Sequence, residues 1–167
     1  MKLRKSTLSD ISSIMRIIGQ AKEYFKKNNI DQWQNNYPNH ATIKKDIDKE
    51  ESYVLINDND ILATVALSFN GEKNYDVIYD GKWLSNENYA VIHRIAVDKN
   101  HKGKGLSGEV FKNLEEICLD NNIRSIKIDT HKENISMKKF LEKSGFKYCG
   151  VIYLPDKSER IAFEKIL

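Results

Sequence analysis

The sequence predicts an α/β protein with a mixed sheet of about seven strands flanked by about four helices, folded as a single domain over residues 1–167. Three observations predict this fold class. Segments rich in β-branched residues alternate with segments of helical periodicity, a strand-helix-strand unit spans residues 89–129, and two strands close the chain. A strand-helix-strand unit makes its strands parallel and a hairpin makes them antiparallel, so a chain with both has a mixed sheet.

The N-terminal half predicts a short strand, two helices and a hairpin. Residues 8–27 place an apolar side chain every three or four positions, and Thr7 is the expected N-cap of this helix. A polar segment at 31–38 precedes the second helix. The turn sequence Asn57-Asp58-Asn59-Asp60 separates the two strands of the hairpin. These elements are expected at 1–4, 8–27, 40–50, 52–57 and 61–69.

The C-terminal half predicts the strand-helix-strand unit, a last helix and the closing strands. Residues 70–87 combine Gly, Asn and Asp with aromatic residues, so they predict a loop or an irregular strand. The next strand is rich in β-branched residues, and the helix after it has an apolar stripe that ends at Asn121-Asn122. Ser144-Gly145 ends the last helix. These elements are expected at 89–97, 106–120, 124–129, 137–143, 146–153 and 160–167.

The composition excludes several classes of protein. Hydrophobic residues make up 40% and charged residues 31%, which suits a globular core and argues against disorder. No apolar run reaches the roughly 20 residues that span a bilayer, and the first residues lack the apolar core of a signal peptide, so we expect a cytoplasmic protein with no membrane partner. The net charge of +3 demands no nucleic acid partner, and Cys118 and Cys149 lack the spacing of a metal site or a disulfide framework.

A glycine-rich segment lies between the strand at 89–97 and the helix at 106–120. Glycines let the backbone approach a ligand closely, and the free N–H groups and positive end of a helix favour phosphate oxygens. Nearby lysines suit a ligand with several phosphates. An ordinary glycine turn with solvated lysines is the alternative. The segment consists of Gly103, Lys104, Gly105, Leu106, Ser107 and Gly108, and the lysines are Lys99, Lys102 and Lys104.

These six residues also fit the GxGxxG pattern of dinucleotide-binding proteins, in which Asp129 would bind the ribose. Against this interpretation, five residues separate Val97 from the first glycine, whereas the dinucleotide fold turns almost directly into it. Too little chain follows Asp129 for a second nucleotide-binding half. The P-loop pattern is absent.

Two sequence runs resemble motifs of the GNAT superfamily of N-acetyltransferases. Residues 95–108 are similar to the acyl-CoA-binding motif, Q/R-x-x-G-x-G/A, and residues 134–146 are similar to the next motif, an Asn followed by a helix that ends in Gly-Phe. The expected strands and helices also follow the family's order, so the resemblance covers nearly the whole chain. The sequence departs from the pattern at Asn100, where Gln or Arg is usual, and at Leu141, where many members carry a tyrosine that protonates the leaving thiolate.

The resemblance implies a V-shaped opening between the strands at 89–97 and 125–129, in which the pantetheine arm of acetyl-CoA lies. The backbone of the first strand would pair with the pantetheine amides, the loop at 102–108 would hold the pyrophosphate, and Asn134 would bond the pantetheine arm. The residues that the resemblance assigns to acetyl-CoA are Ile95, Ala96, Val97, Lys102, Gly103, Lys104, Gly105, Leu106, Ser107, Gly108, Asn134, Met137 and Leu141.

Acetyl transfer to an alkyl amine needs a base, because an amine with a pKa near 10.4 is almost entirely protonated at neutral pH. His93 matches the strand position where some GNAT members place a His or Glu base, and histidine ordinarily titrates near neutral pH. A core histidine bonded to backbone is the alternative, and His131 is a second candidate base. In place of the tyrosine missing at Leu141, the acid would be Tyr148, Tyr153 or a water, unless the thiolate leaves directly.

The resemblance implies acetyl-CoA-dependent transfer of an acetyl group to a primary amine of a small molecule or a peptide, by direct attack in a ternary complex. Trp33, Tyr37 and Trp83 belong to segments that shape the acceptor side of the cleft in GNAT proteins, so they are the expected substrate-binding residues. The alternative is a GNAT-fold domain that binds acyl-CoA as a sensor or partner module without turnover. A monomer or homodimer without a bound metal is expected in either case.

Overall fold

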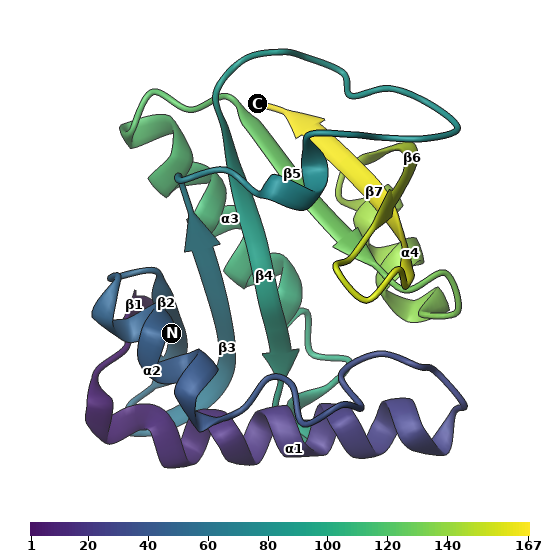
Figure 1. Ribbon diagram of the computed structural model, residues 1–167. Coiled ribbons are helices and arrows are strands. Elements are labelled where there is room, and N and C mark those ends of the chain that lie inside the picture. The colour runs from purple at the N-terminus through teal and green to yellow at the C-terminus, as the bar shows by residue number, and fades with distance from the viewer. The chain divides into compact units, whose positions relative to one another are not determined.

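The computed structural model describes all residues, 1–167, and confirms the predicted fold class. Seven strands form a mixed sheet in the order β1-β2-β3-β4-β5-β7-β6, and four α-helices accompany it (Figure 1). The strands are β1 (Lys2–Lys5), β2 (Ser52–Asn57), β3 (Asp60–Ser68), β4 (Tyr89–Val97), β5 (Ser125–Thr130), β6 (Lys147–Tyr153) and β7 (Glu159–Ile166). The helices are α1 (Ile11–Lys27), α2 (His40–Asp48), α3 (Leu106–Asp120) and α4 (Ile135–Lys143), with short 3-10 helices η1 (Leu8–Asp10), η2 (Lys73–Tyr75) and η3 (Lys99–His101).

The chain folds into two compact units, each made of two segments. The first unit comprises Met1–Leu67 and His93–Leu114, and the second unit comprises Ser68–Ile92 and Glu115–Leu167. Because the boundaries fall inside β4 and α3, each of these two elements contributes one part to each unit. The single domain expected from the sequence stays a prediction.

The first unit contains antiparallel strands and two helices that pack on them. β1 pairs with β2, with Leu3 opposite Leu55, and β2 pairs with β3 through the predicted hairpin. The isoleucines of α1 recur at the spacing of one helical face, and this face meets α2 and β2. Their shared core consists of Ile11, Ile14, Ile18, Ile43 and Val54.

The first helical turn differs from the prediction, because it is a 3-10 turn and the α-helix begins only at Ile11. The Thr7 N–H donates to the Asp10 carboxylate at 2.7 Å, and this carboxylate also pairs with Arg4. The hydrogen bond from Arg4 lowers the pKa of Asp10 by stabilising its charged form. Thr7 therefore caps the turn, as the sequence predicts, while Asp10 ties it to β1.

The second unit holds the parallel strand pair and the closing strands. β4 and β5 run parallel, from Tyr89 opposite Ser125 to Val91 opposite Lys127, as the strand-helix-strand unit predicts. β7 lies between β5 and β6 and is antiparallel to both. The closing strands therefore extend the sheet beyond β5 in the order β5-β7-β6.

The segment between β3 and β4 is a loop with one short helix, η2, and one bridge to β6. Tyr79 and Val151 exchange two backbone hydrogen bonds of 2.8 Å each. A Cβ on Gly150 would lie 2.4 Å from the Tyr79 carbonyl oxygen, so only glycine lets the loop approach β6 this closely. The predicted loop is thus held at a defined point of the sheet edge.

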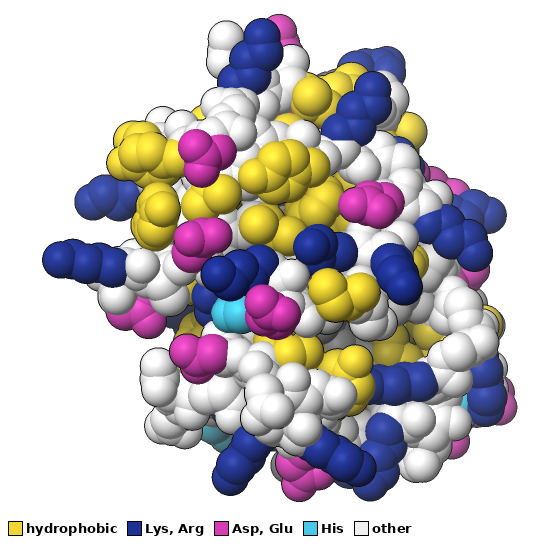
Figure 2. Space-filling model, turned by 90° about the vertical axis from the view of Figure 1, so that its right-hand side faces the viewer, with side chains coloured by type: hydrophobic (Ala, Val, Ile, Leu, Met, Phe, Trp, Pro, Cys, Tyr) yellow, Lys and Arg dark blue, Asp and Glu magenta, His cyan; other side chains and the backbone are white.

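The surface and the cysteines offer few features outside the candidate site. Lys and Arg side chains stand among Asp and Glu side chains across the face that Figure 2 shows. None of the helices is both long enough and apolar enough for a membrane span.

Burial raises the pKa of the free thiols of Cys118 and Cys149, to about 12 and about 11, so both are poor nucleophiles at neutral pH. No three His, Cys, Asp or Glu side chains are grouped to hold a metal ion.

Candidate functional site

The glycine-rich loop at 102–108 connects η3 to α3 in the first unit. Gly103 and Gly105 have φ values of +78° and +76°, which residues with a Cβ rarely adopt. A Cβ at either position would meet no atom within 4 Å, so the backbone conformation, and not a lack of space, requires glycine. Backbone turns of this kind aim successive N–H groups at one point and bind anions.

The start of α3 adds further donors to the loop. The Glu109 N–H donates to the Gly105 carbonyl at 3.1 Å, so the N–H groups of the three residues before Glu109 are first-turn donors with no partner inside the helix. The buried side chain of Leu106 anchors this turn. First-turn donors and the positive end of the helix dipole together favour phosphate oxygens.

Three exposed lysines lie in the loop or shortly before it, at Lys99, Lys102 and Lys104. The Lys102 Nζ lies 4.2 Å from the centre of the Tyr24 ring, near the end of α1. A cation over an aromatic face is attracted by about 0.5–1 kcal/mol at an exposed site. Lys102 is therefore held beside the loop, as an anion site requires.

Asp98 fixes the backbone that leads into the loop. Its carboxylate accepts the Asn100 N–H at 2.9 Å and a hydrogen bond from Arg16 of α1, and its carbonyl accepts the His101 N–H at 2.9 Å. Its own N–H donates to the Leu62 carbonyl of β3 at 2.8 Å. Burial alone would raise the pKa of Asp98, but the bonds from Arg16 and Asn100 outweigh burial and lower it to about 2.

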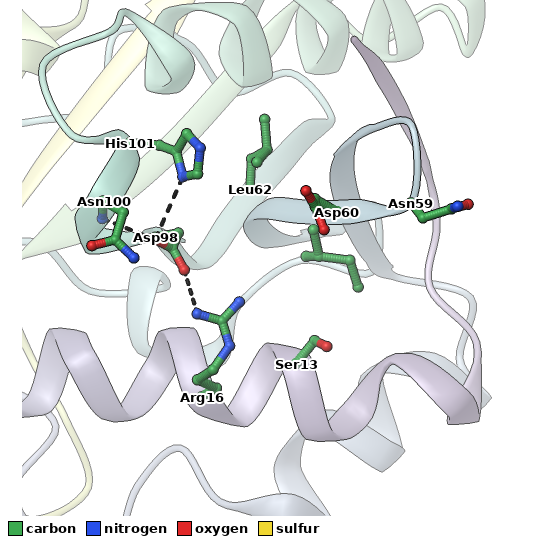
Figure 3. Close-up of a pocket in the computed structure, with 9 residues that line it drawn as sticks. Ser13, Arg16, Asn59, Asp60, Leu62, Asp98, Asn100 and His101 are labelled. Carbon is green, nitrogen blue, oxygen red and sulfur yellow. Dashed lines mark hydrogen bonds and ion pairs between the residues drawn. The ribbon is translucent and has the colours of Figure 1, made fainter.

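A polar pocket of about 290 Å³ lies beside Asp98 in the first unit. Figure 3 shows Arg16 and His101 on opposite sides of the Asp98 carboxylate, with Asp60 farther along the pocket. The His101 Nδ1 is 3.5 Å from Asp98 Oδ1. No sequence pattern reveals the pair of Asp98 and Arg16, because 82 positions separate the two residues and no local spacing links them.

A left-handed residue stands directly before the part of β4 that the resemblance assigns to acetyl-CoA. Arg94 has a φ of +53°, and this conformation in an arginine breaks the regular alternation of side chains along the strand. His93, Arg94 and Ile95 are consequently all half-buried. The proposed base, His93, is thus neither a fully buried core residue nor an exposed one.

Arg94 makes a bidentate ion pair in the first unit. Its Nε and Nη2 donate to the Asp46 carboxylate of α2 at 2.7 Å each, and its Nη1 donates to the Tyr37 hydroxyl at 2.8 Å. Burial alone would lower the pKa of Arg94, but the Tyr37 oxygen and the Asp46 carboxylate outweigh burial and raise it. The sequence predicts Tyr37 as a site residue but not Arg94 or Asp46, since a helical aspartate is ordinarily exposed.

The second motif of the resemblance lies in the second unit. Asn134 is buried and its Oδ1 accepts the Met137 N–H at 3.2 Å, so it caps α4. This cap starts the helix at Ile135, earlier than the predicted 137. Leu141 has an exposed fraction of 0% and packs inside the unit.

The three aromatic residues expected to contact the acceptor lie in different settings. Trp33 packs edge-on against Phe25 at 5.5 Å and against the core of α1 and α2. Tyr37 is exposed, with its hydroxyl bonded to Arg94. Trp83 belongs to the second unit, where its indole N–H donates to the Tyr75 carbonyl at 2.9 Å. Contact of any of them with an acceptor stays a prediction.

The second unit also contains buried polar groups that no sequence motif marks as a site. The Lys127 Nζ lies 4.3 Å from the Trp83 ring centre and 3.9 Å from that of Tyr89, and burial lowers the pKa of this lysine. The Tyr75 hydroxyl donates to Asp129 at 2.6 Å. Burial raises the pKa of Tyr75 well above its usual value, and the negative charge of Asp129 adds to the shift.

The order of strands and helices and the glycine loop before α3 now allow a comparison with known proteins. The sequence matches the Acetyltransferase (GNAT) family over residues 18–146, a range that includes the glycine loop, Asn134 and Leu141. The chain belongs to the GNAT acetyltransferase family. The resemblance of the two motifs to this family is therefore confirmed.

Solved GNAT structures share the fold over nearly the whole chain. A GNAT acetyltransferase from Streptococcus agalactiae is 32% identical with a TM-score of 0.91, and the match covers 99% of this chain and 95% of that one. A putative acetyltransferase from Staphylococcus aureus is 25% identical with a TM-score of 0.75, over 99% of each chain. A ribosomal-protein-alanine N-acetyltransferase from Brucella melitensis, 13% identical with a TM-score of 0.71 over 100% of each chain, shares the fold alone. A search of curated proteins gave no match.

The structure shows where the two departures from the GNAT motif, at positions 100 and 141, lie. Asn100 belongs to η3, and its backbone N–H donates to the Asp98 carboxylate, a bond that does not depend on the side chain at this position. Leu141 fills the interior of the second unit, where a tyrosine would add a polar hydroxyl. The two left-handed glycines of the loop are present in this GNAT chain, while a phenol at position 141 is missing.

Proposed function

We propose that this GNAT protein is an acetyl-CoA-dependent N-acetyltransferase that transfers an acetyl group to a primary amine of a small molecule or a peptide, by direct attack in a ternary complex. The observation that carries the proposal is the glycine loop, in which two left-handed glycines precede the free donors of α3. Asp98 holds the entry to this loop by accepting hydrogen bonds from α1 and η3 and by donating one to β3. A pyrophosphate is the anion that such a loop suits best.

The roles of the chain's own residues follow from this proposal. Backbone groups of 95–97 would bind the pantetheine amides, and the loop at 102–108 with Lys102 and Lys104 would bind the pyrophosphate. Asn134 and Met137 would face the pantetheine arm, whereas Leu141, contrary to the expectation from the resemblance, is fully buried and not accessible to it. The residues fit an acyl-CoA, since the cradle is open, exposed and positively charged, and a Cβ at Gly103 or Gly105 would strain its backbone.

Acetyl-CoA supplies an activated thioester when it is bound. The protein must then bring the amine to its neutral form, because an alkyl amine is almost fully protonated at pH 7. His93 is the proposed base, either directly or through a water, since its imidazole is half-buried on β4 next to the residues assigned to acetyl-CoA. Backbone N–H groups near Ile95 are the simplest donors for a developing oxyanion.

The amine acceptor is the least defined part of the proposal. Trp33, Tyr37 and Trp83 are the proposed acceptor-side residues. The Brucella neighbour is named for an alanine of a ribosomal protein, which makes a peptide N-terminus one candidate, although this neighbour shares only the fold. We further propose a cytoplasmic bacterial protein that acts as a monomer or homodimer.

A second candidate function, acyl-CoA binding without turnover, is favoured by one observation. Leu141 is fully buried and apolar at the position where many GNAT enzymes have a tyrosine. A sensor domain needs the glycine loop but no group that protonates the leaving thiolate. Binding of acetyl-CoA is expected of both functions, and only turnover separates them.

The test combines calorimetric titration with a turnover assay. Acetyl-CoA and CoA should bind the wild-type protein and raise its melting temperature, while NADH should do neither. The protein with acetyl-CoA should then release CoA thiol in the presence of an amine from a panel of spermidine, L-lysine, tyramine, kanamycin and an alanine-initiated peptide. No binding of either CoA species overturns the proposal. Binding without CoA release over the whole panel favours the sensor.

A further inference from the structure

Arg94 joins three segments of the first unit through one guanidinium. It belongs to β4, the Asp46 carboxylate belongs to α2, and the Tyr37 hydroxyl belongs to the loop at 31–39. The side chains of Arg94 and Asp46 have exposed fractions of 13% and 8%, so their two bonds of 2.7 Å form a mostly buried, bidentate pair. The geometry of this pair is therefore well defined, and Tyr37 is attached to a rigid partner.

The backbone of Arg94 is strained in a way that serves this arrangement. A φ of +53° is unfavourable for an arginine, and such residues persist only where the surrounding contacts hold them. Three hydrogen bonds from the side chain provide that support. The strained residue stands between His93 and Ile95, which the proposed function assigns to the base and to the pantetheine site. A contact made through Arg94 is thus made next to the reacting groups.

The loop at 31–39 is tied to both neighbouring helices. The Gln34 Nε2 donates to the Lys22 carbonyl at 3.2 Å, and the Lys22 Nζ donates to the Pro38 carbonyl at 2.5 Å. Asn39 forms a capping box with Thr42 at the start of α2. These contacts tie the loop to α1 and α2, whereas the bond from Arg94 to Tyr37 ties it to β4.

Tyr37 remains accessible although its hydroxyl is bonded. Its exposed fraction is 43%, and its oxygen accepts from Arg94, so its own O–H proton is left to donate to another group. The neighbouring Asp46 carboxylate is engaged by Arg94 through both oxygens and is not offered to a cationic ligand. A ligand at this point therefore meets an aromatic ring and a hydroxyl donor, and not a free carboxylate.

We propose that Arg94 is a positioning residue that holds Tyr37 at β4 as a contact for the amine acceptor. Tyr37 contacts the acceptor through its ring and its O–H, and Asp46 holds the guanidinium in place. The inference rests on the proposed function for the identity of the ligand. It also explains how the polar loop at 31–39 presents Tyr37 at a constant position beside β4.

A purely structural role would make the Arg94–Asp46 pair matter for stability and not for the acceptor. Buried ion pairs often contribute little net stability, so the pair Arg94–Asp46 is not explained by stability alone. Tyr37→Phe leaves this pair intact and removes only the hydroxyl that accepts from Arg94. Since the Tyr37 ring is exposed, this variant should fold normally, and its effects report on loop position and acceptor contact.

The first measurement is hydrogen–deuterium exchange of the amides at 31–39. Tyr37→Phe and Arg94→Lys should speed exchange in this loop about fivefold to tenfold, because each loses a hydrogen bond that closes the loop on β4. Asp48→Asn is the matched control, since it breaks an exposed pair with Lys44 on the same helix as Asp46. Unchanged exchange at 31–39 in Tyr37→Phe overturns the inference, even if Arg94→Lys fails to fold.

The second measurement is steady-state kinetics with the panel amine that gives the fastest CoA release. Tyr37→Phe should raise the KM for the amine about tenfold, while the KM for acetyl-CoA and the protection of amides 102–108 by acetyl-CoA stay at wild-type values. An unchanged amine KM overturns the acceptor contact. Absence of acetyl-CoA protection in the wild-type protein overturns the proposed function itself, and is distinguishable because it does not depend on any variant.

Discussion

The carboxylate of Asp98 pairs with Arg16 across 82 positions of sequence and joins the end of β4 to α1. With the N–H of Asn100 on the same carboxylate, this pair fixes η3, which leads directly into the glycine loop. Asp98 thus fixes the backbone that leads into the glycine loop, although it lies outside that loop. Loss of its charge should be felt both in stability and in the affinity for acetyl-CoA.

Asp98 should make the protein sensitive to acid below about pH 4. Its pKa falls from 3.8 to about 2 in the folded protein, a difference of about 2 kcal/mol at 1.36 kcal/mol per unit. Because the folded pKa is the lower one, this stabilisation is complete above the ordinary pKa and is lost as the pH falls towards 2. Urea unfolding should show Asp98→Asn to be less stable than the wild type by about 2 kcal/mol at pH 6, with the difference shrinking between pH 4 and pH 3.

The control for Asp98 is another acid on a helix that faces solvent. Asp48 pairs with Lys44, but both side chains are about half exposed, so Asp48→Asn should change stability by less than about 0.5 kcal/mol at any of these pH values. Equal effects of Asp98→Asn and Asp48→Asn at pH 6 would show that the pair with Arg16 does not stabilise the fold. Calorimetry with acetyl-CoA on the same variants then measures the effect on the loop.

Local signals predicted most of the fold. The helix at 106–120 has a glycine run before it, an apolar stripe along it and two asparagines after it, and the structure has the same bounds. The hairpin and the closing strands are marked equally well by their turn residues. α4 differs from the prediction at its start, because Asn134 caps the helix and lets it begin at Ile135.

The parts of the site that the sequence does not reveal depend on contacts between distant segments. The left-handed conformation of Arg94 has no sequence signal, since arginine is not a residue that prefers it. Asp46 is one of two acids on a polar helix, and only its contact with β4 distinguishes it. The bridge from Tyr79 to β6 likewise depends on where the loop folds back. A sequence motif can predict a site built from backbone groups. The side chains that support such a site become apparent only from the packing of distant segments.

A Cβ should have opposite effects at Gly105 in the glycine loop and at Gly19 in α1. Gly105→Ala forces a residue with a Cβ into a φ of +76°, which costs about 1–2 kcal/mol or shifts the backbone, and should weaken acetyl-CoA binding at least tenfold. Gly19→Ala is the opposite case, because Gly19 lies inside α1 and a Cβ there would have no atom within 4 Å. It should stabilise the protein by about 1 kcal/mol. Isothermal titration and thermal melts check both, and full acetyl-CoA affinity in Gly105→Ala contradicts the cradle.

Tyr75 should make the protein sensitive to alkali. Its folded pKa is raised well above 10 by burial, so the stability it contributes is complete below pH 10 and is lost as the pH rises above that value, where the unfolded chain ionises. At pH 8, Tyr75→Phe should be less stable by about 1–2 kcal/mol, because the bond of 2.6 Å to Asp129 is lost. Above pH 10 the difference should shrink by about 1.4 kcal/mol per pH unit.

The comparison for Tyr75 is a tyrosine that faces solvent. Tyr148 is exposed and packs edge-on against Phe163, so Tyr148→Phe should keep the alkaline dependence of the wild type. Denaturant unfolding at pH 8, 9, 10 and 11 gives all the required values. A constant difference between the wild type and Tyr75→Phe across this range would mean that Tyr75 ionises equally in both states.

The proposed base has a kinetic signature that distinguishes His93 from His131. If His93 takes the proton from the amine, His93→Gln should remove the rise of kcat/KM near neutral pH and lower its value at pH 7 by about 10²–10⁴-fold. His131→Gln should keep the profile, because the His131 Nδ1 accepts the Glu133 N–H at 3.0 Å and serves a turn. Acetyl-CoA affinity, measured separately, should be unchanged in both variants. The reverse pattern, with the rise lost only in His131→Gln, moves the base to the second unit and leaves His93 as a strand residue beside the pantetheine site.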